Sequence, residues 1–388
     1  MSPEPQTVAS SPVADLDTGS AHSVPEAGIA LCLSGGGYRA MVFHVGVLWR
    51  LNELGYLPKL ARISSVSGGS ITAGVLGLNW NRLAFGPNGV SDKLVELIVK
   101  PIRAMAARNI DVGSVIAGIL MPGSISDMVA NKLDEQLFHG ATLQALPDDP
   151  PRFVINATNV QSGALWRFMK PAMRDYRVGS VPNPKIKLAV AVAASAAFPP
   201  VLSPMTLKLK ESDFAPPTSG EEDLHRPPFT TEVVLSDGGV YDNLGLETAW
   251  KRYQTILVSD AGGKMQPTEK PKSDWIRHSI RVLDLIDNQV RSLRKRQAIS
   301  GFEDKIRTGA YWGIRTDIRD YKLADALPCD FTRTTQLANV ETRLRKLEPV
   351  LQERLINWGY AVCDAAMRKH VQPGLPKPIG FPYKTSGV

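Results

Sequence analysis

Apolar and polar residues follow one another in blocks over the first part of the chain, and these blocks predict strands, turns and helices. Residues 29–33 form a short apolar run, a triple glycine follows at 35–37, and helical spacing of apolar residues continues through Leu54. A second apolar run at 63–66 ends at Ser67, where a Ser-Gly-Gly turn opens another helical pattern. Strands that lead through small-residue turns into helices are typical of an α/β fold with a parallel sheet.

The two turns are the first candidates for chemistry. The amino end of a helix carries unpaired backbone N–H groups and the positive end of the helix dipole, so both turns are suited to hold negative charge. In a parallel sheet, neighbouring strands end at the same edge, and α/β proteins place their sites there. The second turn also carries the hydroxyl of Ser67. We therefore expect the two turns to form one site.

Residues 79–150 do not continue this succession of strands, turns and helices. Apolar residues recur at helical spacing over 92–105 and 126–138, and glycine and proline separate the two stretches. This pattern predicts a helical insertion packed beside the sheet. The insertion is either a cap over the site or a helical layer with no gating role.

The remainder of the chain predicts further strands and helices. Strands are expected at 152–160, 163–168, 232–235, 255–259 and 310–315. Helices are expected at 187–197, 273–298 and 334–370, the last one kinked at Pro349, and the polar segment 207–231 is expected to be a surface loop. The helix at 273–298 has an apolar face, and its other face carries Arg277, Arg281, Arg291, Arg294, Lys295 and Arg296.

Composition and charge fit one large globular domain over residues 28–388, preceded by a disordered tail over 1–27. The net charge of +7 fits an anionic partner such as a phospholipid surface, and the absence of long basic runs argues against nucleic acid. Three scattered cysteines indicate neither a zinc site nor a disulfide framework and fit a reducing compartment. The longest apolar stretch, 188–198, is too short to span a membrane.

The sequence around Ser67 resembles a nucleophile elbow, in which a tight strand-to-helix turn exposes a serine hydroxyl. The usual pattern is G-x-S-x-G, and here Ser65-Val66-Ser67-Gly68-Gly69 keeps the serine and the last glycine. Ser65 stands where the first glycine is usual, and its side chain is small enough to fit there. The motif predicts Ser67 as a nucleophile beside the amino end of a helix.

A serine nucleophile needs a base, and the histidines are poorly placed for that role. None of the six lies in a turn that closes a predicted strand, and His44 is expected to be a packed residue on the first helix. Asp237 does end a predicted strand and is followed by Gly238 and Gly239. A carboxylate within hydrogen-bond reach can act directly as the general base. The alternative is that Asp237 only caps the next helix.

The triple glycine allows backbone N–H groups to approach a ligand oxygen closely, which predicts an oxyanion hole at Gly35, Gly36 and Gly37 with Arg39 adding positive charge. The competing interpretation is a dinucleotide site. Ala40 fills the last glycine position of that motif, and the next strand delivers Ser67 rather than the acidic residue that a ribose requires. Dinucleotide binding is therefore disfavoured.

Three motifs together resemble those of the patatin-like phospholipase family, in the same order and spacing. They are Ser34-Gly35-Gly36-Gly37-Tyr38-Arg39, Ser65-Val66-Ser67-Gly68-Gly69 and Asp237-Gly238-Gly239. The segment SGGGYRAM is also similar to the corresponding loop of cytosolic phospholipase A2 enzymes. The resemblance covers roughly residues 29–263, and Ser65 and Ala40 depart from the family pattern.

The resemblance implies a three-layer α/β sandwich with a central, mostly parallel sheet and helices on both faces. It implies a Ser67–Asp237 dyad that hydrolyses acyl esters of membrane glycerophospholipids without a metal or cofactor. The glycines at 35–37 would supply oxyanion donors, with Arg39 supporting them. The protein would be bacterial and cytoplasmic and would act at the membrane surface.

Two alternatives use the same dyad. One is an acyltransferase or thioesterase, which differs only in the acceptor or in the ester that is cleaved. The other is an effector of a bacterial CBASS anti-phage system that a cyclic dinucleotide activates, an idea that rests on the basic face of the helix at 273–298. A catalytically inactive scaffold is disfavoured, because all three motifs hold competent residues. The sequence leaves oligomer formation open.

Overall fold

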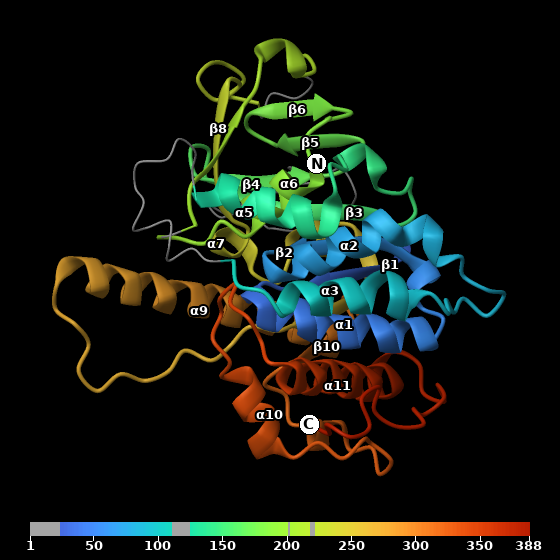
Figure 1. The fold of residues 1–388 in the computed structure, drawn as a ribbon. Helices are drawn as coiled ribbons and strands as arrows, with labels where there is room; N and C mark the ends of the chain where they lie inside the picture. Colours follow the sequence, from blue (N-terminus) through green and yellow to red (C-terminus); the bar gives the residue numbers. More distant parts are fainter. Residues whose placement is uncertain (1–23, 111–124, 201, 218–221) are drawn as a thin grey trace, which may run out of the picture.

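The computed structural model describes residues 24–110, 125–200, 202–217 and 222–388 (Figure 1). Most of the tail expected at 1–27 lies outside these residues. The first strand, β1 (Glu26–Leu33), begins two residues before the expected boundary of the domain. The helices and strands form a layered arrangement around one sheet.

The described part of the chain forms a ten-stranded sheet in which β10, β9, β1, β2, β3, β4, β5 and β6 lie in that order, and β8 pairs with both β3 and β7. The strands after β1 are β2 (Leu60–Val66), β3 (Arg152–Asn159), β4 (Ala164–Phe168), β5 (Ala172–Asp175), β6 (Gly179–Pro182), β7 (Met205–Lys208), β8 (Glu232–Asp237), β9 (Tyr253–Asp260) and β10 (Thr308–Gly313).

The centre of the sheet is parallel and its far side is antiparallel. Strands β10, β9, β1, β2 and β3 run parallel to their neighbours, whereas β4, β5, β6, β7 and β8 pair antiparallel. The mostly parallel core is the one that the family resemblance implies, whereas the antiparallel side was not predicted. The short strands β5, β6 and β7 were not predicted, and β7 begins at the edge of the segment expected to be a loop.

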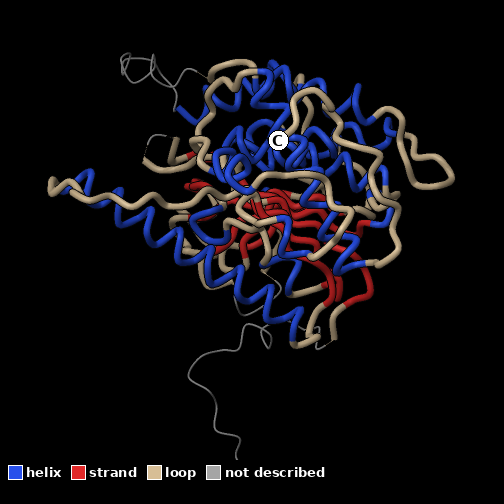
Figure 2. Tube along the Cα trace, turned by 90° about the horizontal axis from the view of Figure 1, so that it is seen from below, coloured by secondary structure: helices blue, strands red, loops and turns tan. Residues whose placement is uncertain are grey.

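Helices cover both faces of the sheet. They are α1 (Gly37–Glu53), α2 (Gly68–Leu83), α3 (Lys100–Ala106), α5 (Ile125–Leu133), α6 (Leu188–Ser195), α7 (Gly239–Asp242), α8 (Glu247–Trp250), α9 (Trp275–Glu303), α10 (Phe331–Ala338) and α11 (Pro349–Ala366). Single π-turns extend three of them, at Val95–Val99, Asp134–Phe138 and Met367–Val371. Figure 2 shows the strands enclosed between helices.

The alternation of side chains along β1 shows how the two faces are filled. Leu31 and Leu33 are buried in the larger core with α1, α2 and α11, whereas Ala30 and Cys32 are buried in a smaller core with α8 and the end of α9. Successive residues of a strand point to opposite faces, so a strand that is apolar at every position must be covered on both sides. The apolar run that the sequence shows at 29–33 therefore marks a central strand.

The insertion expected at 79–150 is helical in its described part. Helix α3 contacts α1, and α5 contacts α6, so both extend the helical layer on one face of the sheet. Within the described residues, only Asn109 and Ile110 of the insertion line the cavity that contains Ser67. Residues 111–124 lie outside the described residues, and a capping role stays a prediction.

The C-terminal region differs from the expected single helix kinked at Pro349. Two helices, α10 and α11, are separated by the non-helical residues 339–348. Pro349 is the first residue of α11, a position where proline fits because its missing N–H would have no partner within the helix. The separating segment becomes part of the site, as described below.

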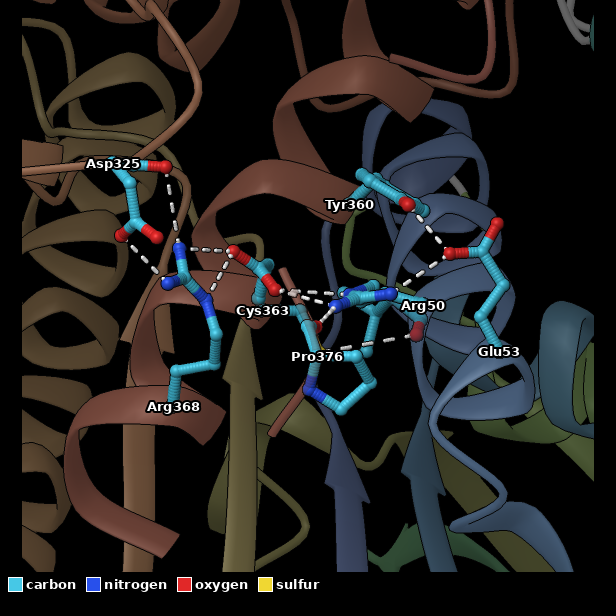
Figure 3. A network of polar contacts seen from close by, with 9 residues as sticks. Arg50, Glu53, Asp325, Tyr360, Cys363, Arg368 and Pro376 are labelled. Atoms are coloured by element: carbon cyan, nitrogen blue, oxygen red, sulfur yellow. Dashed lines mark hydrogen bonds and ion pairs between the residues drawn. The ribbon is translucent and has the colours of Figure 1, made fainter. Parts of the chain in front are cut away.

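Helix α11 is held against α1 by a network of buried charges (Figure 3). Arg50 of α1 lies 2.8 Å from Asp364 of α11, and Asp364 also pairs with Arg368 at 2.9 Å. Arg50 reaches Glu53, and Arg368 reaches Asp325. Because Asp364 is almost fully buried, its charge depends on both arginines.

Candidate active site

Ser67 occupies a strained corner between β2 and α2. Its backbone angles are φ 51° and ψ −121°, in a region that residues with a side chain seldom adopt. The corner turns the chain from strand to helix within one residue and leaves Ser67 on the wall of a cavity. This is the nucleophile-elbow geometry predicted from the Ser-Gly-Gly motif.

The glycine after Ser67 brings the two turns together. A Cβ on Gly68 would lie 2.0 Å from the carbonyl oxygen of Gly37, and a Cβ on Gly69 would lie 2.5 Å from that of Leu33. Only glycine allows the start of α2 to approach the glycine turn so closely. The structure thus places both turns at one site, as expected for neighbouring parallel strands.

Asp237 reaches Ser67 because of the way β8 joins the sheet. Strand β4 occupies one side of β3, so β2 and β8 share the other side, β2 along its first part and β8 along its last. Val66 pairs with Asn156, and Asp237 pairs with Ala157, the next residue. The carboxyl ends of β2 and β8 therefore meet head to head.

The side chains of Asp237 and Ser67 face the same cavity, close enough that the Ser67 hydroxyl lowers the pKa of the Asp237 carboxyl group. The Oδ1 atom of Asp237 accepts the backbone N–H of Gly239 at 2.7 Å, which fixes the orientation of the carboxyl group. Burial raises the pKa of Asp237 to about 7, and the Gly239 N–H and the nearby Ser67 hydroxyl oppose that rise only in part. A carboxyl group with this pKa can take up and release a proton near neutral pH.

At Gly35, the structure differs from the predicted oxyanion hole. The N–H of Gly35 is shared between the backbone oxygen and the side-chain Oδ1 of Asn243, each at 3.1 Å, so it is not free to bind a substrate oxygen. The N–H groups of Gly36 and Gly37 have no hydrogen-bond partner among the described residues. Both glycines have positive φ, at 142° and 58°, and these two donors remain for an oxyanion.

Asn243 is a site residue that sequence analysis missed. It directly follows α7, the single helical turn after the Asp-Gly-Gly motif, and lies on the cavity wall. Its Oδ1 lies near both Gly35 and Gly239, so one amide side chain connects the glycine turn with the turn that follows Asp237. The sequence signal that could have identified Asn243 is its place in the segment DGGVYDNLG, which begins with the Asp-Gly-Gly motif.

Arg39 lies behind the glycine turn rather than in open solvent. Its Nε donates to the carbonyl oxygen of Ala261 at 3.0 Å, its Nη1 donates to that of Val340, and its Nη2 has no partner among the described residues. Burial, together with the nearby charge of Arg291, lowers the pKa of Arg39 to about 10, so it stays charged at neutral pH. The positive charge that the sequence predicts is therefore present beside Gly36.

Buried serines support the elbow from behind. Ser195 Oγ accepts the backbone N–H of Ser67 at 2.9 Å and donates to the carbonyl oxygen of Asn156 at 2.6 Å. Ser70 Oγ lies 2.9 Å from Ser195 Oγ and donates to Ser65 Oγ at 3.0 Å. Ser65, which departs from the usual glycine, thus takes part in this hydrogen-bonded group.

His44 is a structural residue, as expected. It is fully buried, with Nε2 at 3.0 Å from the carbonyl oxygen of Ser34 and Nδ1 at 2.9 Å from the Ser259 hydroxyl. The carbonyl oxygen can only accept, so Nε2 carries the proton and Nδ1 accepts from Ser259. Burial lowers the pKa of His44 to about 4. No histidine of the described chain lines the cavity.

The cavity that contains Ser67 and Asp237 has a volume of about 970 Å³. Part of its wall is apolar and includes Ile110, Phe198 and Leu202. Other parts come from three segments: the loop at 262–266, the polar side of α9, and residues 338–345 at and after the end of α10. A cavity of this size can hold a substrate of the size of a drug molecule or part of a lipid chain.

Residues 339–348 contact the glycine turn directly. The backbone N–H of Tyr38 donates to the carbonyl oxygen of Arg343 at 3.0 Å, and a Cβ on Gly37 would lie 2.7 Å from that oxygen. The C-terminal region therefore holds the outer side of the glycine turn. The sequence does not indicate this contact, because residues 339–348 were expected to be part of a helix.

Within the described residues, no group of histidine, cysteine, aspartate and glutamate side chains is arranged to hold a metal ion. None of the helices described has the length and apolar character that crossing a bilayer requires. The site has a serine on a strained turn, a buried carboxyl group on the same cavity, and two backbone N–H groups of the glycine turn without a partner among the described residues. These are the parts of a nucleophilic acyl-transfer site.

The sequence model of the patatin-like phospholipase family matches residues 31–250, which is more than half of the chain. The chain therefore belongs to the patatin-like phospholipase family, as the three motifs predict. Membership of this family supports lipid acyl hydrolase activity. A search among curated protein sequences finds no matching relative.

Solved structures with a similar fold include human GIVD cytosolic phospholipase A2 and VipD from Legionella pneumophila. The human enzyme in complex with methyl gamma-linolenyl fluorophosphonate is 14% identical, with a TM-score of 0.45 over 87% of this chain and 57% of that one. VipD is 15% identical, with a TM-score of 0.32 over 88% of this chain and 66% of its own. In another structure of the human enzyme, this chain spans only 45% of the length.

Proposed function

We propose that this protein is a serine acyl hydrolase that cleaves acyl esters of membrane glycerophospholipids through an acyl-enzyme on Ser67. The observation that carries the proposal is that Ser67, on its strained corner, and the buried carboxyl group of Asp237 line the same cavity at the meeting ends of β2 and β8. This cavity also presents the backbone donors of Gly36 and Gly37. Membership of the patatin-like phospholipase family supports a phospholipid ester as the substrate.

In the first half of the reaction, the ionised carboxylate of Asp237 takes the proton of the Ser67 hydroxyl as its oxygen attacks the ester carbonyl. The negative charge that develops on the carbonyl oxygen is stabilised by the N–H groups of Gly36 and Gly37 and by the charge of Arg39. The tetrahedral intermediate then breaks its bond to the alcohol. Asp237 returns the proton to the departing alkoxide, and the lysolipid leaves.

In the second half, water replaces the alcohol. Asp237 takes one proton from water while the water oxygen attacks the acyl carbon, and the same backbone donors hold the oxyanion. The bond to Ser67 breaks, the proton returns to the serine oxygen, and the fatty acid is released. One residue acts as base and then as acid in each half, which suits a pKa of about 7.

The cavity fits an acyl chain better than a small polar substrate. The apolar part of its wall includes Ala196, Phe198 and Leu202. Burial of methylene groups stabilises a bound chain by roughly 0.8 kcal/mol for each CH₂ removed from water. We infer that this wall binds the fatty acyl group while the ester carbonyl faces Gly36.

The test is release of fatty acid from phospholipid vesicles by the full-length protein and by Ser67→Ala and Asp237→Asn. Both variants are expected to lose at least about a thousandfold of the activity, since each removes a group that changes bonds in every step. The exposed residues Ser300 and Asp92 give matched controls, Ser300→Ala and Asp92→Asn, which should keep it. Full activity of either active-site variant would exclude the dyad.

The same assay separates the alternative reactions. A hydrolase releases free fatty acid, whereas an acyltransferase leaves the acyl group on an added alcohol or lysolipid. Repeating the assay with cyclic dinucleotides tests the predicted activator. The basic face that suggested it is largely engaged within the protein: Arg294 pairs with Glu247 at 2.9 Å, and Arg291 donates to Asn288 at 3.1 Å. The activator thus stays a prediction without structural support of its own.

A further inference from the structure

Helix α9 is oriented opposite to the usual arrangement of an amphipathic helix. Its polar side, including Asp284, Asp287 and Asn288, lines the cavity of Ser67. Its apolar side faces solvent, with Trp275, the first residue of the helix, 79% exposed. A surface helix normally buries its apolar side against the core, so this exposed side needs another explanation.

The exposed apolar side chains form one stripe. Positions 275, 282, 286 and 293 recur at intervals of seven and four residues and fall on one side of the helix, and 276 and 283 lie beside them. We call this set the α9 stripe: Trp275, Ile276, Val282, Leu283, Ile286 and Leu293. With Leu285, it supplies seven of the 17 large exposed apolar side chains in the described part of the chain.

The stripe lies on a projection of the molecule next to the cavity. Figure 1 shows the first half of α9 extending away from the other helices, and the view in Figure 2 shows the same projection. Arg281 and Asp284 line the cavity from the same turns of the helix that carry Val282 and Leu283 on the stripe. The stripe and the cavity therefore lie on opposite sides of the same turns of α9, one helix diameter, roughly 10 Å, apart.

The charge around the stripe is positive. Residues 264–299, which include α9 and the loop before it, contain nine lysines and arginines against four aspartates and glutamates. Lys264, Lys270 and Lys272 in that loop are exposed. An apolar stripe with a tryptophan and flanking cations is the pattern of a helix that lies in the surface of an anionic bilayer.

A second copy of the helix fits the stripe less well. A helix–helix seam requires apolar residues at alternating intervals of three and four, and in that register Ser279 and Gln289 interrupt the seam. Two copies would also place their surplus of positive charge together, whereas anionic lipid headgroups neutralise it.

We propose that the α9 stripe docks this protein on anionic phospholipid bilayers and holds the catalytic cavity about one helix diameter from the lipid surface. Its purpose rests on the proposed function, because a phospholipase must reach a substrate that stays in the membrane. Docking itself needs no catalysis. Trp275, Leu283 and Ile286 enter the boundary between headgroups and acyl chains, and the exposed lysines before the helix, Lys270 and Lys272, contact the phosphates.

The binding experiment uses the full-length Ser67→Ala protein, so that no lipid is consumed. Sedimentation with phosphatidylethanolamine vesicles containing phosphatidylglycerol is compared with sedimentation with phosphatidylcholine vesicles. The double variant Leu283→Gln/Ile286→Gln should bind the anionic vesicles at least about tenfold more weakly, since two buried aliphatic side chains are lost. The matched control Val350→Gln/Ile379→Gln removes two exposed apolar residues elsewhere and should bind as before.

Several outcomes would overturn the proposal. Equal binding by the stripe variant and its control would show that another surface contacts the membrane. Equal binding to phosphatidylcholine and to anionic vesicles would exclude recognition of anionic lipid. If the protein is a dimer without vesicles and the stripe variant is a monomer by light scattering, the stripe is an interface between two copies.

A second measurement separates this proposal from the proposed function. The ratio of vesicle hydrolysis to hydrolysis of a short-chain soluble ester should fall about tenfold or more in the stripe variant with Ser67 intact. If neither ester is cleaved by the protein, the proposed function fails, yet the binding experiment still decides the docking surface. If the ratio is unchanged while binding falls, the stripe does not deliver substrate to this cavity.

Discussion

The side-chain Oδ1 of Asn243 accepts the backbone N–H of Gly35 at 3.1 Å, a contact between residues 208 positions apart in the sequence. It fixes the first glycine of the turn, so that the N–H groups of Gly36 and Gly37 are held beside Ser67. Asn243 touches none of the bonds that change in the proposed reaction. It is a positioning residue for the donors of the oxyanion hole.

Replacing Asn243 with alanine should therefore slow the chemical step more than it weakens substrate binding. We expect kcat to fall by about tenfold to a hundredfold with little change in KM. This decrease should not exceed the one caused by removing a direct oxyanion donor. Steady-state kinetics on a soluble ester provide the measurement. Asn339→Ala, at another point of the cavity wall, is the control. An increase in KM alone would place Asn243 in substrate binding instead.

Gly68→Ala should inactivate the protein by separating the two turns. The new Cβ would lie 2.0 Å from the carbonyl oxygen of Gly37, so the start of α2 or the glycine turn must move. A displacement of this size removes at least one oxyanion donor, and activity should fall by at least about a hundredfold. Gly380→Ala, where a Cβ meets nothing within 4 Å, is the matched control. Circular dichroism distinguishes a local shift from unfolding.

The sequence predicts those parts of the site that depend on local patterns. A β-branched run ending in Ser-Gly-Gly is enough to place Ser67 on a corner, because the chain must turn there and only small residues permit it. The strand before Asp237 is likewise visible as a short apolar run. Both residues then meet because their strands end beside adjacent residues of β3.

Contacts between distant segments could not be predicted in this way. Asn243 and Gly35 are joined by one hydrogen bond that leaves no periodic signal, and Arg343 contacts Tyr38 through backbone atoms that any residue possesses. The apolar face of α9 was visible in the sequence, but a pattern does not say whether such a face meets the core or solvent. The strands β5, β6 and β7 are too short for a clear alternation.

Activity should rise with pH through neutrality. Only the ionised form of Asp237 can accept the proton of Ser67, and the pKa of Asp237 is raised to about 7. The profile of kcat/KM for a soluble ester should therefore increase between about pH 6 and 8 and reach a plateau above it. A profile that is flat from pH 5 to 9 would contradict a base with this pKa. Asp92→Asn should leave the profile unchanged.

Ionisation of the buried Asp237 carboxyl group destabilises the parent at alkaline pH, so Asp237→Asn should be more stable than the parent there. The folded-state pKa of Asp237, about 7, lies above the value near 4 expected in the unfolded chain. The stability that the protonated form supplies is complete below about pH 4 and is lost as the pH rises to about 7. At pH 8, the amide should raise the free energy of unfolding by up to about 4 kcal/mol. Urea denaturation at pH 8 and pH 4 measures the difference.

The buried side chain of His44 should change the free energy of unfolding with pH in the opposite direction below about pH 6.5. Its folded-state pKa is lowered to about 4, so the unfolded chain binds a proton between about pH 6.5 and 4 that the folded protein does not. The contribution of His44 to stability should fall by up to about 3 kcal/mol over this window as the pH decreases, opposite to the contribution of Asp237. His44→Asn should flatten this part of the curve, whereas the exposed His139→Asn should not. Urea denaturation at steps from pH 7.5 to 4 provides the test.

Asp364 holds two arginines of the buried network, and removing its charge should destabilise the protein without changing the reaction. Asp364→Asn leaves Arg50 and Arg368 beside a neutral amide, and breaking a buried ion pair on one side costs about 3–5 kcal/mol. The midpoint of urea denaturation should decrease accordingly. The folded fraction should keep the kcat of the parent, because the network is not part of the cavity wall. Asp325→Asn, which removes an outer and more exposed partner of Arg368, should cost much less. Equal effects of the two variants would mean that burial of Asp364 does not set the strength of the network.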